Sequence, residues 1–211
     1  MKYPITRRDA LRAGLTISGT AVAGCLGAQR TGPVLQESFE TGLSDWETAG
    51  NIDPEEPPST FEWRIDRSQA RAHKGDWSLE IFTEGDHDDG TAWVMTDFQT
   101  PADILSFEGS VQAWSPSESF NTLRHLVVYL GPNRPREEGS FLGPGENSSG
   151  TPGARIGGLR EPLHLAEGWR EYTFEWQPAT VPNTLYFAVG ISVVWEADAT
   201  HYVDSIELSA T

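Results

Sequence analysis

The side chains best suited to catalysis in this sequence are carboxylates on a segment of alternating polarity. Glu171 and Glu175 alternate with Tyr172, Phe174 and Trp176, so a strand would place both acids on one face. Glycoside cleavage needs two carboxylates about 5 to 9.5 Å apart, one on each side of the bond. Nothing else marks these two as a pair, and the solvent face of a strand explains them equally well. Enzymatic activity, as a polysaccharide hydrolase or lyase, is therefore left open as an alternative.

Other reactive groups form no recognisable catalytic or metal-binding pattern. The five histidines show no metal-ligand spacing, and no serine nucleophile motif is present. The histidines are His73, His87, His125, His164 and His201. Segment 84–90 (Glu-Gly-Asp-His-Asp-Asp-Gly) alternates carboxylates as a calcium loop does, but it lacks the distal glutamate of an EF-hand. Because Asp and Gly are also turn formers, a solvated hairpin turn is the favoured interpretation.

A second kind of chemistry is the stacking of sugar rings on aromatic side chains. Pyranose rings stack on flat aromatic faces, and nearby polar side chains hold their hydroxyl groups. Strand periodicity predicts that two neighbouring strands present aromatic and polar side chains above a floor of small residues, including Ala188 and Gly190. The candidate ligand-binding face comprises Trp114, Tyr129, Gln112, Arg124 and Ser192. In the alternative, the second sheet or a long loop covers Trp114 and Tyr129.

Six further tryptophans are expected in the core or at its edge. They are Trp46, Trp77, Trp93, Trp169, Trp176 and Trp195.

These side chains must be positioned by β-strands, because apolar residues recur at every second position and no helical period collects them as well. Residues 184–208 show this most clearly and are predicted to form a closing hairpin, with alternate residues from Leu185 to Trp195 on its core face. Further strands are expected at 33–39, 61–66, 70–74, 77–83, 91–98, 105–114, 124–131 and 169–176. About ten short strands without long helices predict an all-β fold, a two-sheet antiparallel β-sandwich of the jelly-roll type.

Two segments are too rich in proline, glycine or charge to be read as strands. Residues 49–59 and the long Gly/Pro-rich segment 131–168 are expected as loops. The sequon Asn147-Ser148-Ser149 lies in the second loop and makes Asn147 a candidate glycosylation site.

The N-terminal residues read as an export signal. Arg7 and Arg8 precede a short apolar run that ends in Val22-Ala23-Gly24-Cys25, which resembles a twin-arginine signal followed by a lipoprotein cleavage box. The expected organisation is a signal peptide at 1–24, a lipidated Cys25 with a tether at 25–33, and one domain at 34–211. An ordinary signal peptide with a chance cysteine is the alternative. The predicted location is extracellular, on a membrane anchor.

The charge and the cysteine content limit the kinds of molecule and metal that this protein can bind. The chain has 15 basic and 31 acidic residues and a formal net charge of −16, which disfavours nucleic acid. Cys25 is the only cysteine, so the domain has neither disulfides nor a thiolate metal site. Lys74 is the only lysine after the signal peptide, and this acidic composition resembles that of secreted proteins from salt-loving archaea.

Four motifs, in this order, resemble the galactose-binding-like jelly roll of carbohydrate-binding modules. They are Glu37-Ser-Phe-Glu40 with Trp46, His73-Lys-Gly-Asp-Trp-Ser-Leu79, Gly168-Trp169 and Tyr202-Val-Asp-Ser-Ile206. The resemblance spans Val34 to Leu208 and implies sugar binding without catalysis. It also implies one structural calcium, held by Glu37 or Glu40, by backbone carbonyls at Lys74 and Asp76, and by Asp204. Calcium accepts six to eight oxygen ligands of these kinds. In the alternative, Asp204 caps or pairs within its strand.

The sequence therefore predicts a non-catalytic, monomeric, carbohydrate-binding-like module. Its expected partner is a polysaccharide or cell-surface glycan, and its lipid anchor is the only expected contact with the membrane. The alternatives are a structural or adhesive surface lipoprotein without sugar binding, and the hydrolase or lyase considered above.

Overall fold

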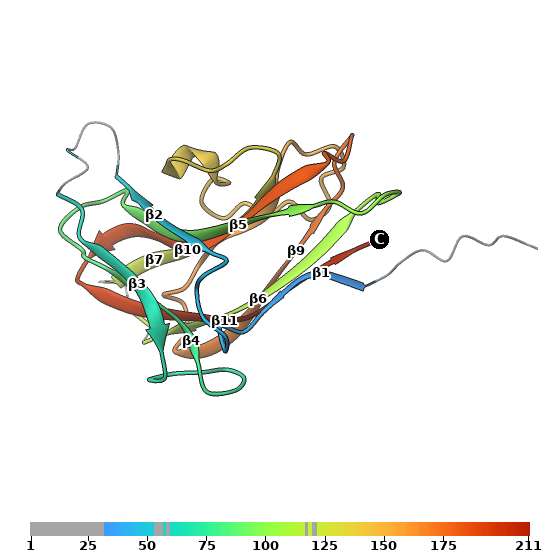
Figure 1. The fold of residues 1–211 in the computed structure, drawn as a ribbon. Coiled ribbons are helices and arrows are strands. Elements are labelled where there is room, and N and C mark those ends of the chain that lie inside the picture. The colour runs from blue at the N-terminus through green and yellow to red at the C-terminus, as the bar shows by residue number, and fades with distance from the viewer. Residues whose placement is uncertain (1–31, 53–56, 58–59, 117, 120–121) are drawn as a thin grey trace, which may run out of the picture.

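Two antiparallel sheets lie face to face in the computed structural model (Figure 1). It describes residues 32–211 except 53–56, 58–59, 117 and 120–121. All strand pairs between these residues are antiparallel, so the predicted β-sandwich is confirmed. The predicted signal peptide, Cys25 and nearly all of the tether lie outside the described residues. Within the described part, no helix is long and apolar enough to span a bilayer.

The sheet called sheet A here has the strand order β3-β4-β11-β6-β9, and β1 pairs with the C-terminal half of β11. Its strands are β1 (Gly32–Glu37), β3 (Trp63–Ser68), β4 (Ser78–Thr83), β6 (Phe107–Ser115), β9 (Gly168–Trp176) and β11 (Ala199–Ala210). Sheet B has the order β2-β5-β10-β7-β8. Its strands are β2 (Glu47–Asn51), β5 (Thr91–Gln99), β7 (Thr122–Gly131), β8 (Gly157–Pro162) and β10 (Thr184–Glu196).

The core lies between the sheets because alternate residues of each strand point inward. Phe107 and Val111 of β6 and Leu126 and Val128 of β7 are fully or almost fully buried there. Phe107 also stacks on Trp176, with ring centroids 5.6 Å apart. Burying each such side chain stabilises the fold by roughly 1.5–3 kcal/mol, which explains how a domain without disulfides holds together.

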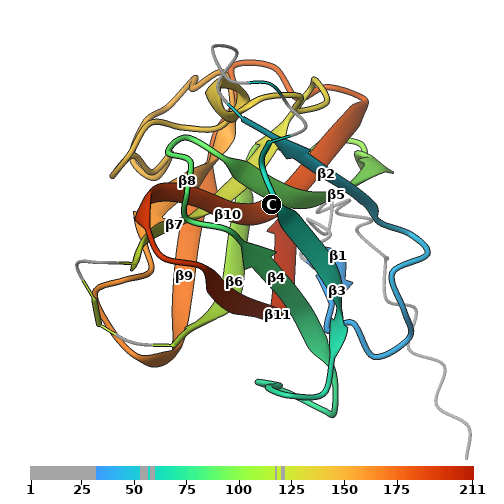
Figure 2. The same ribbon diagram turned by 90° about the vertical axis from the view of Figure 1, so that its left-hand side faces the viewer.

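The prediction of a closing hairpin at 184–208 is wrong. β10 occupies the centre of sheet B and β11 the centre of sheet A, so the chain crosses from one layer to the other between them (Figure 2). Both strands carry an apolar face, and these faces meet across the core instead of lying side by side. The pairing of β10 with β7 also shifts between Val193 and Trp195. This bulge breaks the alternation, and Trp195 is 46% exposed rather than in the core.

Three other local predictions change. Residues 70–74, expected as a strand, belong to the loop between β3 and β4. Conversely, β8 forms within the expected loop 131–168, and β2 extends into the expected loop 49–59. Segment 84–90 forms turns as expected, but it joins β4 of sheet A to β5 of sheet B and is not a hairpin. Its glutamate, Glu84, accepts hydrogen bonds from the Asp86 backbone N–H and the His87 ring.

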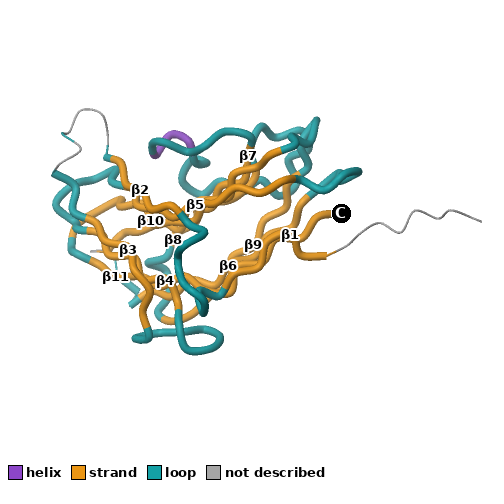
Figure 3. Tube along the Cα trace, viewed as in Figure 1, coloured by secondary structure: helices purple, strands orange, loops and turns teal. Residues whose placement is uncertain are grey.

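The long connection between β7 and β8 covers the outer face of sheet B. It contains the 3₁₀ helix η1 (Glu138–Ser140), which lies outside the layer that contains β5 and β7 (Figure 3). Phe141 packs edge-on against Trp93 and Tyr129, with ring centroids 5.5 Å and 6.1 Å away. On the outer face of sheet A, the loop between β3 and β4 lies against β6 and β9 through Arg71 and His73.

Candidate functional site

Three aromatic side chains lie side by side on the outer face of sheet A. Trp169 of β9 pairs directly with Trp114 of β6, and Trp114 pairs directly with Tyr202 of β11. The rings of Trp114 and Tyr202 meet edge to face, 5.5 Å apart. Both tryptophans are half-buried, and Tyr202 is 8% exposed. We refer to Trp169, Trp114 and Tyr202 as the aromatic row.

Polar side chains lie along one side of the aromatic row and at one end of it. Gln112 and Glu171 form the next outward-facing pair on β6 and β9. On β4, Glu80 lies opposite Tyr202, accepts a hydrogen bond from it, and stands 3.7 Å from Arg64. Burial, followed by the charge and hydrogen bond of Glu80, raises the pKa of Tyr202, so its hydroxyl remains protonated at neutral pH. A flat aromatic surface with flanking amide and carboxylate groups suits recognition of a hydroxyl-rich ring.

The loop 69–77, which we call the strap, crosses over this row. The guanidinium carbon of Arg71 lies 4.4 Å from the ring centroid of Trp114, a cation–π contact. The His73 ring lies 5.5 Å from that of Trp169, and its Nδ1 is 3.1 Å from Ser205 Oγ. Both Arg71 and His73 are exposed. The strap therefore adds charged and polar groups to the aromatic row.

Two carboxylates from distant parts of the chain hold the strap in place. Asp204, which is fully buried, accepts hydrogen bonds at Oδ2 from the backbone N–H groups of His73 (2.7 Å) and Lys74 (2.9 Å). Glu40 Oε1 accepts from the N–H groups of Asp76 (3.0 Å) and Trp77 (2.9 Å). Hydrogen bonds to ionised acceptors are the stronger kind, so these four contacts determine where the strap lies.

The residues predicted to hold calcium meet at this corner. Glu37 accepts hydrogen bonds from Ser38 and Phe39 N–H at one oxygen and from the Trp46 indole at the other. Glu37, Glu40 and Lys74 line an open cavity of about 570 Å³. However, Lys74 and Asp76 direct N–H groups at the acids, whereas a calcium ion would use their carbonyls. Within the described residues, no group of three or more His, Cys, Asp or Glu side chains is arranged to hold a metal ion. Calcium binding stays a prediction.

The five residues of the predicted ligand-binding face do not lie together. Trp114 and Gln112 are on the outer face of sheet A, as their periodicity predicts, while Tyr129 and Ser192 are on the outer face of sheet B. Arg124 points between the sheets because it has the same parity as the core residue Leu126. The grouping assumed that β7 lies beside β6, but β6 pairs with β9 and β11.

Tyr129 and Ser192 serve to attach the loop that covers sheet B. The Tyr129 hydroxyl donates to the carbonyl of Asn133 at 2.6 Å, and burial raises its pKa. Ser192 Oγ accepts from Arg160 at 2.9 Å and donates to Glu138 Oε1 at 3.1 Å. Arg160 and Glu138 form an ion pair at 2.5 Å. This network fixes η1 to β8 and β10, and Ala188 and Ser192 of the floor that the sequence predicted are fully buried.

Asn147, the candidate glycosylation site, uses its side-chain amide within the fold. Its Nδ2 donates to Glu161 Oε1 at 3.1 Å and to the Thr173 carbonyl at 2.9 Å, and its Oδ1 accepts from Ser149 N–H. A glycan on Nδ2 would replace one of the two donated hydrogen bonds. Glycosylation stays a prediction.

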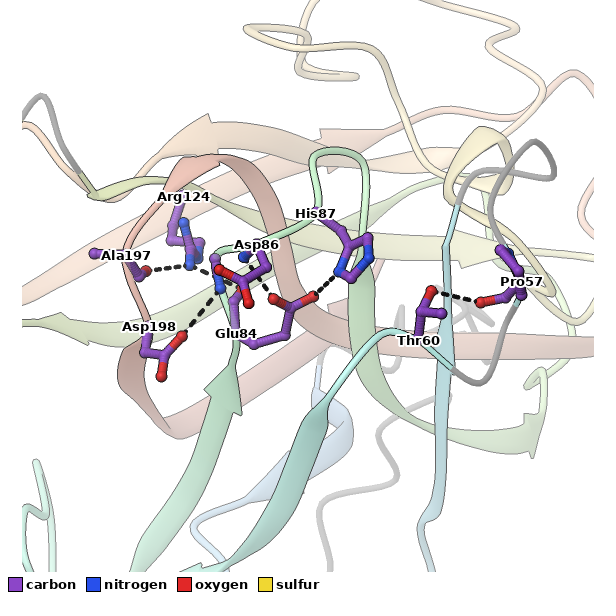
Figure 4. A network of polar contacts seen from close by, with 9 residues as sticks. Pro57, Thr60, Glu84, Asp86, His87, Arg124, Ala197 and Asp198 are labelled. Atoms are coloured by element: carbon purple, nitrogen blue, oxygen red, sulfur yellow. Dashed lines mark hydrogen bonds and ion pairs between the residues drawn. The ribbon is translucent and has the colours of Figure 1, made fainter.

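Arg124 is the centre of a buried polar network at the end of the sandwich where β10 passes into β11 (Figure 4). Its guanidinium donates to Thr83 Oγ1 at 3.0 Å and to the carbonyls of Glu84 and Ala197 at 3.2 Å and 2.7 Å. Burial lowers the pKa of Arg124 to about 10 despite the opposing charges of Glu84 and Asp198. The side chain therefore stays charged at neutral pH and acts as a structural link between the sheets.

Sequence reasoning missed four residues of the site, and for three of them a signal was present. Trp169 has the opposite parity to the core residues Tyr172 and Phe174 of the same strand, and Tyr202 the opposite parity to Val203. His73 belongs to one of the four quoted motifs. Nothing in the local sequence marks Arg71, because its place depends on how the strap folds over β6.

Several solved structures share this fold. One, from work on carbohydrate-binding modules of the β-sandwich superfamily with promiscuous specificity, has a TM-score of 0.54 at 19% identity; the match covers 85% of this chain and 63% of that one. TmCBM61, solved with β-1,4-galactotriose, has a TM-score of 0.50 at 12% identity, covering 83% and 95%. The K3 cleaved adhesin domain of Lys-gingipain from Porphyromonas gingivalis has a TM-score of 0.51 at 16% identity, covering 85% and 98%.

These likenesses establish a shared β-sandwich fold and nothing further, since all three sequence identities are below 25%. No family model and no curated protein sequence matches the chain.

Proposed function

We propose that this protein is a non-catalytic, extracellular carbohydrate-binding module that binds a polysaccharide or cell-surface glycan on the outer face of sheet A. The observation that carries the proposal is the aromatic row, with Trp169, Trp114 and Tyr202 on adjacent strands and polar groups next to them. A rigid sheet holds these rings without the entropy loss of ordering a mobile loop. Carbohydrate-binding modules among the structures of the same fold support this choice of ligand class.

The fold also suits a module tethered to a membrane through a lipid on Cys25. Gly32, the first described residue, pairs with Ala210 at the far end of β11. Tyr202 lies eight residues away on the same strand, roughly 26 Å at about 3.3 Å per residue. A tether that enters at β1 would therefore hold the aromatic row away from the membrane surface. Export by the twin-arginine route and lipidation belong to this proposal.

A structural calcium at the corner of Glu37, Glu40 and Asp204 is part of the proposal. A cation there would neutralise acids that already gather around the strap, and it would supply the positive charge that the backbone N–H groups now supply in part. Its role would be to hold the strap, with no part in any reaction. Its test is the effect of chelation on melting, given in the Discussion.

Isothermal titration calorimetry with a panel of soluble polysaccharides tests the function. We expect saturable binding of at least one glycan, and we expect Trp169→Ala to weaken it by about 1–3 kcal/mol, the usual range for an anchoring aromatic side chain. Trp195→Ala is the matched control, because Trp195 is also exposed but lies on β10 of sheet B. The affinity of Trp195→Ala for the glycan should equal that of the unsubstituted protein.

If the folded protein binds no glycan, the sugar-binding proposal fails and the adhesive or structural alternative takes its place. If Trp195→Ala, and not Trp169→Ala, removes binding, the protein binds sugar but the site is elsewhere.

A further inference from the structure

Cations gather beside the aromatic row although acids outnumber bases about two to one in the chain, 31 to 15. Arg64, Arg67, Arg71 and Lys74 lie within β3 and the strap. Two of them are already engaged: Arg64 pairs with Glu80, and Arg67 donates to the Glu40 carbonyl while stacking on Trp77. The strap therefore brings positive charge to one face of a protein that is otherwise strongly negative.

Arg71 differs from Arg64 and Arg67 because its guanidinium has neither an ion pair nor a hydrogen-bond partner among the described residues. Its guanidinium is exposed and lies over Trp114. A guanidinium group has five N–H donors in a planar fork that matches a carboxylate or sulfate. In so acidic a chain, an arginine held on a ring with all its donors available is best explained by an external anion.

The stacking of Arg71 on Trp114 also limits how Trp114 can contact a sugar. Arg71 covers the ring face that a neutral pyranose would use, so a sugar on this part of the row meets the guanidinium first. The ring holds the guanidinium in place, which reduces the entropy lost when it binds a ligand. The accessible surface thus combines an aromatic edge at Trp169 with a cation above Trp114.

We infer that this site recognises an anionic sugar residue, with Arg71 binding its carboxylate or sulfate group while the sugar ring contacts Trp169. The inference rests on the proposed function and narrows its ligand class to acidic polysaccharides. His73, 5.5 Å from Trp169 on the same strap, offers a second polar group to the same sugar.

The carboxylates nearest the row leave room for such an anion. Glu80 is engaged by Tyr202 and Arg64, and Glu40 and Asp204 are engaged by backbone N–H groups. Glu171 is exposed, and it lies one outward pair away from Trp169, beside Gln112. The ligand's anionic group is therefore expected beside the guanidinium of Arg71, above Trp114.

The test compares two matched pairs of polymers by titration calorimetry in about 1 M NaCl. At that ionic strength the Debye length is about 3 Å, so repulsion by the net charge is screened and direct contacts remain. Polygalacturonate is compared with its methyl ester, and dextran sulfate with dextran; neutral galactan and xylan complete the panel. The first pair isolates a carboxylate and the second a sulfate.

We expect one acidic polymer to bind roughly tenfold or more tightly than its neutral counterpart, and Arg71→Gln to remove that preference. Arg170→Gln is the control: it removes the same charge from an exposed arginine on β9 that stacks on Tyr172 instead of the aromatic row. Its affinity should change less than twofold.

Equal binding of acidic and neutral polymers, unaffected by Arg71→Gln, would overturn this inference and leave the sugar-binding function intact. Absence of binding to every polymer would overturn both.

Discussion

Replacing Asp204 with alanine tests how the strap is held. The Asp204 carboxylate is fully buried and accepts three backbone hydrogen bonds: 2.7 Å from His73, 2.9 Å from Lys74 and 2.5 Å from Ser205. Asp204→Ala removes all three. His73 and Lys74 are exposed, so their N–H groups regain water as the strap loosens, at a loss of about 1 kcal/mol each. Adding about 1 kcal/mol for the half-buried Ser205 N–H gives a loss of about 3 kcal/mol in the free energy of unfolding.

Thermal melting followed by circular dichroism measures this loss. For a domain of this size, about 3 kcal/mol corresponds to a Tm lower by roughly 6–12 °C. Asp204→Asn keeps one carbonyl acceptor and should lose about half as much. Asp97→Ala, at an exposed position on β5, should stay within about 0.5 kcal/mol of the unsubstituted protein. A change of less than about 2 °C for Asp204→Ala would show that the strap does not depend on this carboxylate.

Three further predictions concern calcium, pH and backbone geometry. A chelator should lower the Tm of the unsubstituted protein and not that of Asp204→Ala; an equal Tm with and without chelator would remove calcium from the account. His201 is buried with no hydrogen bond from its ring to any described residue, and burial, with the nearby Arg124 charge, lowers its pKa from 6.5 to about 3. Between pH 6.5 and pH 3, only the unfolded chain takes up a proton on His201. The contribution of neutral His201 to the free energy of unfolding is therefore complete above pH 6.5 and declines toward pH 3, by about 2 kcal/mol at pH 5. Between pH 7.5 and pH 5, the free energy of unfolding measured in urea should therefore fall by about 2 kcal/mol less for His201→Leu than for the unsubstituted protein. An equal fall in both proteins would contradict this. Gly158→Ala should cost more than about 2 kcal/mol, because φ is +125° and the new Cβ would lie 1.9 Å from the Val128 carbonyl oxygen. Gly145→Ala, with φ of +78° and open space, should cost only about 1 kcal/mol, and equal costs would rule out the clash.

Local periodicity predicted most of the strands and the direction of many side chains. Gln112 and Trp114 face outward on β6 as expected, and the fold class follows from the same alternation. Arg124 was assigned to the wrong face, although its parity with Leu126 already places it inside. Trp195 could not be placed from parity, because the bulge after Val193 resets the alternation.

The site itself depends on contacts between distant parts of the chain. The aromatic row requires that β6 lie between β9 and β11, and local patterns do not state which strands pair. Residues 70–74 of the strap were predicted as one of several short strands separated by turns. The actual course of the strap is determined by Asp204, more than a hundred residues later in the chain, and by Glu40, more than thirty residues earlier.

The most direct test of the central claim is an NMR titration that follows the indole N–H signals of the eight tryptophans while glycan is added. The account predicts that the signals of Trp169 and Trp114 shift, since both lie in the aromatic row. The signals of the buried Trp93 and Trp176, and of Trp195 on sheet B, should not move. A glycan that binds and shifts Trp195, or shifts neither Trp169 nor Trp114, would contradict it.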